Sequence, residues 1–305
     1  MADNKIIDLS KLPPPQVIEP VDFEATLAEM KADIITSAPE TKAALALESS
    51  VLSKFLERSA YWLMGRTQKE NEDANAVMLA YATGADLEHL GADYGVERLT
   101  IVPEDTSTTP PTPAVMESND DLRRRIQLAP KSFSVAGPVD AYVFYTLSAD
   151  GRVRDAVAYN PSPGIAAVTV LSREDNGQAS QELIDMVDAA LNAKYIRPLT
   201  DLVQISSAVI VPYEIKANIY ILPGPDTGIV FANVQASIAA YVESIHSIGT
   251  HVPISGLMAA MHIDGVEKVE LIQPTAEVTV NENTQAAFCT AIDLTAQEAQ
   301  RSSTP

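Results

Sequence analysis

The sequence predicts an α+β protein with a long-helix region at its N-terminus, followed by two small α+β sandwich-like domains in tandem with mostly antiparallel sheets. In the first hundred residues, apolar side chains recur every three or four positions, which is the period of a helix. From about Gly137 onward, helical segments alternate with short strand-like runs. We expect six regions: an extended arm (1–20), a helical bundle-forming region (21–99), a Pro/Thr-rich linker (100–118), α+β domains at 119–208 and 209–295, and a flexible tail (296–305).

The N-terminal region begins with an arm and a first helix. The arm ends in LPPPQVIEP, whose prolines favour an extended chain and exclude a helix. The helix is indicated by one apolar stripe, which Pro39 then interrupts. Its members are Phe23, Leu27, Met30 and Ile34.

The segment Thr41–Ala82 is predicted to be helical throughout, because it contains no proline and a single glycine, Gly65. It carries two neighbouring stripes: Ala44, Leu47, Val51, Phe55, Arg58 and Trp62 in one, and Leu45, Leu52, Leu56 and Leu63 in the other. Such a wide apolar face is more than one adjacent helix usually covers, and helices that project alone are marginally stable. Either the rest of this chain or other chains must therefore bury it, and the linker that follows favours other chains.

A short helix, Ala85–Tyr94, closes this region, with Gly95 where a left-handed C-cap is expected. The stretch Val102–Asp120 is rich in proline, threonine and acids and is predicted to be a loop. Ser118 and Asp121 then form a capping-box pattern before a helix at 120–129.

The first α+β domain is predicted to contain a helix opened by Gly137–Pro138, strands at 152–160 and 165–172 joined by the turn PSPG, a helix capped by Ser180 that extends to Tyr195, and a strand at 202–206. In the second, Tyr213–Ile221 alternates cleanly between apolar and polar residues, as a half-buried strand does. A helix through Phe231–Ile245, a shorter helix capped by Ser255, and strands at 265–274 and 276–281 complete the prediction.

Composition limits the possible functions. The formal net charge is −20, so the chain repels nucleic acid and anionic lipid, and we expect neither as a partner. A single cysteine, Cys289, precludes an intrachain disulfide, and neither a signal-like nor a membrane-length apolar run is evident. These features predict a protein made in a cytoplasm.

No residue pattern indicates chemistry, so we predict no catalytic, metal or cofactor site. Cys289 with His262 is the best nucleophile–base pair, but Cys289 lies in an apolar stretch typical of a buried side chain. His246 and His251 have no third ligand near them in the sequence. The strand-to-helix stretch LPGPDTG contains two prolines and an aspartate instead of the free N–H groups and lysine of a phosphate loop, and is interpreted as a helix-capping turn.

The dense cationic cluster consists of Arg123, Arg124 and Arg125. These side chains either pair with acids of their own chain or contact an acidic neighbouring subunit.

From Tyr81 to Leu294 the chain resembles the baseplate J-like proteins of contractile phage tails and R-type pyocins. The segments that carry this resemblance, in order, are ATGADLEHLGADYGVERL, ESNDDLRRRIQLA, SVAGPVDAYVFYTLSADGRVRDA, PSPGIAAVTVL, RPLTDLVQISSA, VPYEIKANIYILPGP, GVEKVELIQP and FCTAIDLT. None is a catalytic signature. Their order and spacing make the resemblance specific.

The resemblance implies a structural, non-enzymatic role and no cofactor. Two copies of such a protein would bundle helices with one I-like tail protein to form a baseplate wedge. Neighbouring wedges would join into a ring around the hub or spike, next to the sheath initiator. The chain would be assembled in the bacterial host cytoplasm and then reside in the baseplate. The bundle contacts would be Leu27, Met30, Ile34, Leu45, Val51, Leu52, Phe55, Leu56 and Trp62.

Two alternatives remain open. The chain could be a scaffold subunit of another contractile injection machine built on the same module, or an enzyme with an unrecognised site.

Overall fold

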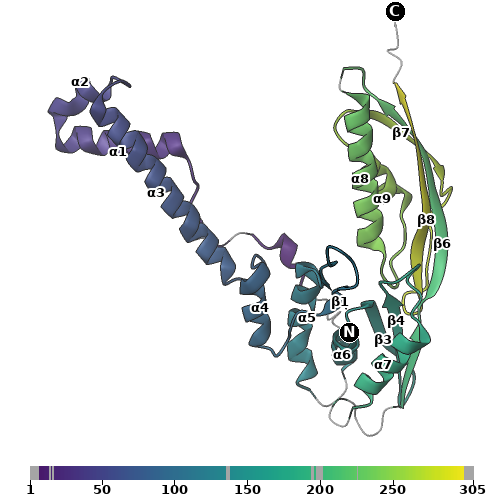
Figure 1. Cartoon of the computed structure of the whole chain (residues 1–305). Helices are drawn as coiled ribbons and strands as arrows, with labels where there is room; N and C mark the ends of the chain where they lie inside the picture. Colours follow the sequence, from purple (N-terminus) through teal and green to yellow (C-terminus); the bar gives the residue numbers. More distant parts are fainter. Residues whose placement is uncertain are drawn as a thin grey trace, which may run out of the picture. The chain divides into compact units, whose positions relative to one another are not determined.

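The computed structural model describes residues 7–13, 15, 17–134, 138–193, 196, 202–224 and 226–298, and the chain divides into two compact units (Figure 1). Unit 1 comprises Met1–Glu97 and Asn119–Gln127, and unit 2 comprises Arg98–Ser118 and Leu128–Pro305. The predicted α+β class is confirmed, because helices dominate unit 1 whereas unit 2 contains two three-stranded sheets with their own helices.

Unit 1 is built around helices α1 (Phe23–Ser37) and α3 (Val51–Ala76), which lie side by side (Figure 1). Helix α1 starts at an N-cap: the Asp22 carboxylate accepts a hydrogen bond from the Ala25 N–H at 3.0 Å. Pro39 opens a 3₁₀ turn, η2 (Pro39–Thr41), that leads into the one-turn helix α2 (Lys42–Leu45). Apolar side chains of all these helices form the core of this region: Phe23, Leu27, Met30, Ile34, Ile35, Leu45, Leu52, Leu56 and Ala60.

The expectation of one uninterrupted helical segment from Thr41 to Ala82 was wrong. The helix breaks between Leu45 and Val51, because the Ser50 hydroxyl accepts a hydrogen bond from the Ser53 N–H at 3.0 Å and so starts α3 anew. The apolar stripe continues across the break, so periodicity alone gave no sign of it. At its other end α3 stops at Ala76.

The N-terminal arm is held along unit 1 by hydrogen bonds to its backbone. After the 3₁₀ turn η1 (Leu9–Lys11), the Asn71 side-chain amide donates to the Glu19 carbonyl at 2.8 Å and accepts from the Glu19 N–H at 3.0 Å. Tyr81 donates its hydroxyl to the Leu12 carbonyl at 2.9 Å, and Gln127 donates to the Ile7 carbonyl at 3.1 Å. Of the predicted arm, residues 1–6, 14 and 16 lie outside the described residues.

Helix α4 (Gly84–Ala92) ends two residues before the predicted Tyr94, but Gly95 has the predicted left-handed conformation, at φ +70°. The Val96 N–H bonds the Gly91 carbonyl at 2.9 Å and the Gly95 N–H bonds the Ala92 carbonyl at 3.0 Å, which is the Schellman pattern. This cap ends the helix, and unit 2 begins at Arg98 in the sequence.

The predicted linker is not a plain loop. Strands β1 (Thr100–Val102) and β2 (Val115–Met116) pair antiparallel, and the buried Glu117 carboxylate accepts a hydrogen bond from the Leu99 N–H at 3.1 Å. Composition predicted a loop here because both strands are too short to show an alternation. Helix α5 (Asn119–Ser132) follows and continues past the predicted end at 129.

The first sheet of unit 2 has the order β3-β4-β5. Strands β3 (Val153–Ser162) and β4 (Ile165–Ser172) pair antiparallel, and β4 pairs parallel with β5 (Leu202–Ser207). The accompanying helices are α6 (Val139–Ala149) and α7 (Gln181–Leu191), the latter capped as predicted by the Ser180 hydroxyl. The expected roles of Gly137 and Tyr195 fall outside the described residues.

The second sheet has the order β7-β6-β8, with helices α8 (Thr227–Ile245) and α9 (Ile254–Met261) on one face (Figure 1). Strand β6 (Val209–Ile221) pairs antiparallel with β7 (Val266–Gln273) and parallel with β8 (Gln285–Glu298). The predicted alternation is confirmed, because the residues expected to face the core are all buried: Tyr213, Ile215, Ala217, Ile219 and Ile221. The expected capping turn is also present, since the Asp226 carboxylate accepts from the N–H of Gly228 at 2.8 Å; Pro225 in that stretch is outside the described residues.

Three predictions for this domain were wrong. Ser255 is not a cap, because it lies inside α9, whose N-cap position is Pro253. The stretch 276–281 forms an isolated bridge at Val278 and is no strand. The last strand is instead β8, which extends to Glu298, so the first three residues of the expected tail are paired with β6. Residues 299–305 of the tail are not among the described residues.

The two sheets of unit 2 are joined by a buried junction. Leu171, Ala208, Ile248 and Ala286 form its apolar centre. Beside it, the Asp155 carboxylate accepts a hydrogen bond from the Ile248 N–H at 3.0 Å. Arg154 donates to the carbonyls of Glu243 and His246 at 2.6 and 2.8 Å and forms an ion pair with the Glu243 carboxylate. A cation thus binds two carbonyls at the end of α8, of which that of Glu243 also accepts the His246 N–H.

Helix α8 is, by length and composition, apolar enough to cross a membrane. Three of its residues, Val230, Val234 and Ile238, belong to the core that also contains the inward side chains of β6. Packing against the core of unit 2 explains the apolar composition of α8, because a helix that contributes to a core is also rich in apolar residues.

Candidate docking surface

The side of α3 that faces away from α1 carries large apolar and charged side chains. We call it the outer face of α3 and define it by the residues Val51, Phe55, Arg58, Tyr61, Trp62, Leu63, Gly65, Arg66, Lys69, Glu70 and Asp73. It is the surface on which the candidate function of this chain depends.

The opposite, inner side of α3 is closed by its own chain. Ser53, Leu56 and Ala60 are buried at three- and four-residue spacing, and Asn71 continues the row toward the arm. Ala60 is completely buried, which allows α1 to approach closely at this point. Leu45, Leu52 and Leu56 of the second predicted stripe are therefore covered within unit 1, whereas its fourth member, Leu63, is exposed and belongs to the outer face.

Aromatic and aliphatic side chains on the outer face are open to solvent. Val51 is 86% exposed, Phe55 66% and Trp62 69%. Contiguous apolar surface of this kind on a protein typically marks a site of contact with another protein. Tryptophan in particular is enriched among residues that dominate binding energy.

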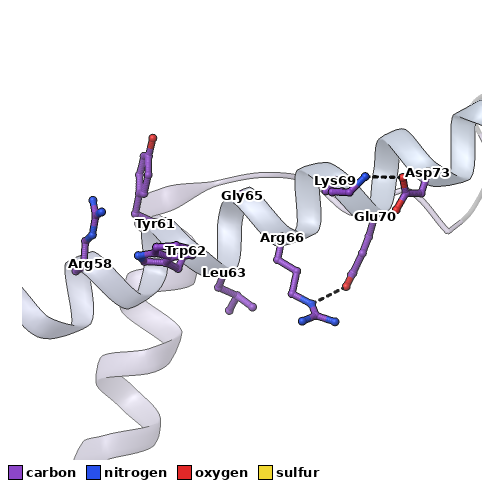
Figure 2. A pocket seen from close by; sticks show the side chains of 9 residues that line it. All are labelled: Arg58, Tyr61, Trp62, Leu63, Gly65, Arg66, Lys69, Glu70 and Asp73. Carbon is purple, nitrogen blue, oxygen red and sulfur yellow. Dashed lines mark hydrogen bonds and ion pairs between the residues drawn. The ribbon is translucent and has the colours of Figure 1, made fainter. Parts of the chain in front are cut away.

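The middle of the outer face forms a shallow groove around Gly65 (Figure 2). At one end the Arg58 guanidinium lies 5.6 Å from the Tyr61 ring centroid and 5.8 Å from that of Trp62, within cation–π range. Gly65 contributes no side chain, and an added Cβ would meet no described atom within 4 Å. The groove is therefore bordered by aromatic rings, and the space over Gly65 can accept a side chain of another molecule.

The other end of the groove is charged. Arg66 pairs with Glu70 at 3.0 Å and Lys69 with Asp73 at 2.9 Å, each one helical turn apart (Figure 2). The hydrogen bond to Asp73 raises the pKa of the Lys69 ammonium, which stays protonated at neutral pH. Among the residues that the structure describes, Arg58 has ring contacts but no ion pair. Exposed pairs of this kind contribute little to stability and are readily exchanged.

The predicted bundle residues separate into two groups. Leu27, Leu45 and Leu56 are buried inside unit 1, with Met30, Ile34 and Leu52 partly buried against them. The remaining three, Val51, Phe55 and Trp62, lie on the outer face. Contact with other subunits stays a prediction, and it now rests on these three exposed residues.

Arginines of the cationic cluster donate hydrogen bonds to backbone carbonyls of their own chain. Arg123 donates to the carbonyls of Leu79 and Ala82 at 2.7 and 2.9 Å and pairs with Asp120. Arg125 is 96% buried and donates to the Glu97 carbonyl at 3.1 Å. Arg123 thus pairs with an acid of its own chain, as one of the two expected alternatives held, and both arginines also bind backbone carbonyls. Arg124 is partly exposed, and its contact with another subunit stays a prediction.

The residues considered as catalytic or metal-binding candidates are half-buried or hydrogen-bonded to the backbone. Cys289 is half-buried in β8, and burial raises the pKa of its thiol, which disfavours the nucleophilic thiolate. His246 Nδ1 lies 2.7 Å from the Ala287 carbonyl oxygen, and His251 Nδ1 accepts the Val280 N–H at 3.1 Å. Within the described residues no group of three or more His, Cys, Asp or Glu is placed to hold a metal ion.

Sequence reasoning missed part of the outer face. Tyr61, Lys69 and Asp73 line the groove but belong to neither predicted apolar stripe. The signal that could have identified them is the run RTQKENED, whose opposite charges recur four residues apart, as on a solvated helix surface.

Comparison with known proteins gives consistent matches along the chain. The family model described as Baseplate J-like N-terminal domain matches residues 48–105, which include α3. The Baseplate J-like central domain matches 134–207, and the Baseplate J-like protein C-terminal domain matches 213–295. The chain is also 48% identical over 290 residues to baseplate protein J of Escherichia phage P2, covering 93% of this chain and 96% of that protein.

Proposed function

The chain belongs to the baseplate J-like family, and from this premise we propose that it is a structural subunit of a tail baseplate that acts by assembly and not by catalysis. Its phage relative, named as a baseplate protein, is matched over nearly its whole length. That extent supports a role for the entire chain, and not for one transplanted domain.

We further propose how this subunit assembles. The outer face of α3 would join a helical bundle with a second copy of the chain and an I-like tail protein, forming one wedge. Unit 2 would link neighbouring wedges into a ring around the hub or spike, beside the sheath initiator. Assembly would take place in the bacterial host cytoplasm, before the subunit takes its place in the baseplate of the particle.

The observation that carries the proposal is the exposure of Val51, Phe55 and Trp62 beside a stripe that α1 already covers. Burying one large apolar side chain contributes about 1.5–3 kcal/mol. Three such residues and the neighbouring Tyr61 and Leu63 would therefore supply a substantial part of the free energy of association.

The test introduces charge at the centre of this surface. We expect the double variant Phe55→Asp/Trp62→Asp to lose co-purification with a differently tagged second copy and with the I-like protein, because carboxylates would be desolvated in the bundle. The fold should persist, since both side chains are exposed in the single chain. Co-expression pull-down and thermal unfolding measure the two effects.

A matched control adds the same charge elsewhere. Leu222→Asp/Ile229→Asp changes two exposed apolar residues in unit 2. This variant should retain the complex with the I-like protein. Undiminished co-purification of the Phe55→Asp/Trp62→Asp variant would show that the outer face of α3 is not the bundle contact.

A further inference from the structure

We propose that the two sheets of unit 2 are joined by a latched hinge, in which Ala208 is the pivot and Arg154 with Asp155 is the latch. We call residues 138–207, from α6 to β5, the first lobe, and residues 209–298, from β6 to β8, the second lobe. When the latch opens, the second lobe turns relative to the first while both keep their folds. The inference goes beyond the proposed function, because it concerns a motion inside one chain.

Within the described residues, the chain connects the two lobes at one place. It passes from the end of β5 at Ser207 to the start of β6 at Val209 through a single residue, Ala208. The Ala208 N–H donates to the Val170 carbonyl of β4 at 2.8 Å, which fixes the pivot to the first lobe. Hinges are typically a few residues between elements that absorb a change in backbone angles. One crossing permits such a rotation, whereas a second crossing would restrain it.

The packing between the lobes is small compared with the packing inside them. Among the described helices and strands from α6 to β8, every pair that packs extensively lies within one lobe. In the described part of the chain, the apolar centre of the junction has four buried side chains, whereas the core of the second lobe has fifteen. Domains of one chain move relative to each other unless their interface is large and apolar. The lobes should therefore separate at a lower free energy than either needs to unfold.

Arg154 forms the larger part of the latch, because it reaches from β3 of the first lobe to the last turn of α8 in the second. Its guanidinium donates to the carbonyls of Glu243 and His246 at 2.6 and 2.8 Å and pairs with the Glu243 carboxylate. The His246 ring lies directly against the first lobe, since a Cβ added to Gly177 would be 2.9 Å from its Nε2 atom. The contacts of Arg154 are polar, so water can replace them when the lobes part.

Asp155 forms the second part of the latch. Its buried carboxylate accepts hydrogen bonds from the Ile248 N–H in the second lobe at 3.0 Å and from the Ala156 N–H at 2.9 Å. Arg154 and Asp155 are consecutive in β3, and both bind the segment 243–248. They should therefore release it together. Hydrogen bonds made by ionised groups are the stronger ones, which favours the closed state in the isolated chain.

Residue-resolved hydrogen exchange of the full chain under native conditions measures the opening. The Ile248 N–H is bonded to Asp155 across the junction, whereas the neighbouring Gly249 N–H is bonded to the Gln285 carbonyl inside the second lobe. We expect Arg154→Ala to accelerate exchange at Ile248 on the order of tenfold, because hydrogen bonds from a charged group are lost. Exchange at Gly249 should keep its rate. Equal acceleration at both amides would show local fraying after α8 and would overturn the hinge.

Arg152→Ala is the matched control. Arg152 lies two residues before Arg154 and has a similarly shielded side chain, but it pairs with Asp150 and Glu182 inside the first lobe. This variant should leave exchange at Ile248 as it is in the natural chain. Unchanged exchange at Ile248 in Arg154→Ala as well would show that Arg154 is no latch.

The second experiment measures the distance between the lobes with pairs of spin labels in a Cys289→Ser background. One label replaces Ala189 of α7 in the first lobe and the other Met258 of α9 in the second, and both positions are exposed. A reference pair at Ile229 and Met258 lies entirely in the second lobe. Pulsed electron paramagnetic resonance gives the distribution of distances for each pair.

The double variant Arg154→Ala/Asp155→Ala removes the whole latch and should broaden the distribution between the lobes or add a second distance, while the reference pair stays unchanged. An unchanged distribution between the lobes would overturn the hinge. A change in the reference pair would overturn it too, because the second lobe would then not move as a folded body. Both experiments use the full chain without a partner, so their results do not depend on assembly through the outer face of α3.

Discussion

Single residues of unit 2 connect its stability to pH, and His246 is the clearest example. Its ring is half-buried at the end of α8, with Nδ1 2.7 Å from the Ala287 carbonyl oxygen. Burial is the largest influence and lowers the pKa of the imidazole, and the positive charge of Arg154 acts in the same direction. The Ala287 hydrogen bond and the carboxylates of Glu243 and Asp155 oppose the shift. The folded chain therefore prefers neutral His246.

The sign of the pH effect follows from proton uptake. Near and below pH 6.5, the unfolded chain binds a proton at His246 that the folded chain binds less readily, so the free energy of unfolding falls as the pH decreases through this range. We expect His246→Asn to reduce the loss of stability between pH 7.5 and pH 5.5, because asparagine does not titrate. Urea unfolding at the two pH values measures it.

His262→Asn, at an exposed position, is the control and should leave the pH dependence close to that of the natural chain. An unchanged pH dependence in His246→Asn would assign the loss of stability to other groups.

How far a site can be predicted also differs from residue to residue. Val51, Phe55 and Trp62 were found because a helical stripe is a local property of the sequence. The carbonyl contacts of Arg123 and Arg125 could not be found, because they depend on turns 28 to 44 residues away in the chain. Nor does periodicity reveal which of two stripes α1 covers.

Among the helices, the two glycines Gly65 and Gly91 are expected to respond oppositely to the same substitution. A Cβ at Gly65 enters open space, whereas at Gly91 it would lie 2.6 Å from the Val96 carbonyl oxygen and 3.3 Å from Ile126. We predict that Gly65→Ala raises the free energy of unfolding by about 0.5–1 kcal/mol. Gly91→Ala should lower it by about 1–3 kcal/mol, because the closing turn of α4 must move.

Denaturant unfolding at a concentration where the chain is monomeric measures both changes. A destabilised Gly65→Ala variant would mean that the glycine serves a contact inside its own chain.

Strands were predicted well only where their surroundings impose a simple pattern. Strand β6 lies between two others with helices on one face, so its residues alternate between buried and exposed. Strand β8 lies at an edge and exposes consecutive residues from Thr290 to Asp293, which removes the alternation that periodicity requires. Its pairing with β6 is also distant in sequence. The break before Ser50 escaped prediction for a related reason, since the apolar stripe continues across it.

For the molecule as a whole, the division into two units predicts which fragments fold best. The hairpin at 98–118 belongs to unit 2, where a Cβ on Gly151 would lie 2.4 Å from the Thr100 carbonyl oxygen. A fragment 119–295 loses this close contact and also the last three residues of β8. We expect a fragment 98–298 to unfold at a temperature several degrees higher, since 1 kcal/mol corresponds to roughly 2–4 °C at this size.

Differential scanning calorimetry of the two fragments provides the test. Both fragments retain Leu122 and Ile126 of α5, so these residues do not affect the difference in unfolding temperature. Equal unfolding temperatures would place the hairpin outside the cooperative unit. The predicted boundary at residue 119 would then be the better one.

The way the N-terminal arm is attached has a consequence for sequence divergence. Asn71, Tyr81 and Gln127 bind the arm through its backbone, and every peptide offers the same carbonyl groups. Related proteins can therefore vary the side chains at Ile7, Leu12 and Glu19 without detaching this segment, while replacement of the three anchoring side chains would release it. Evolutionary drift should accumulate in the arm and be suppressed at its anchors.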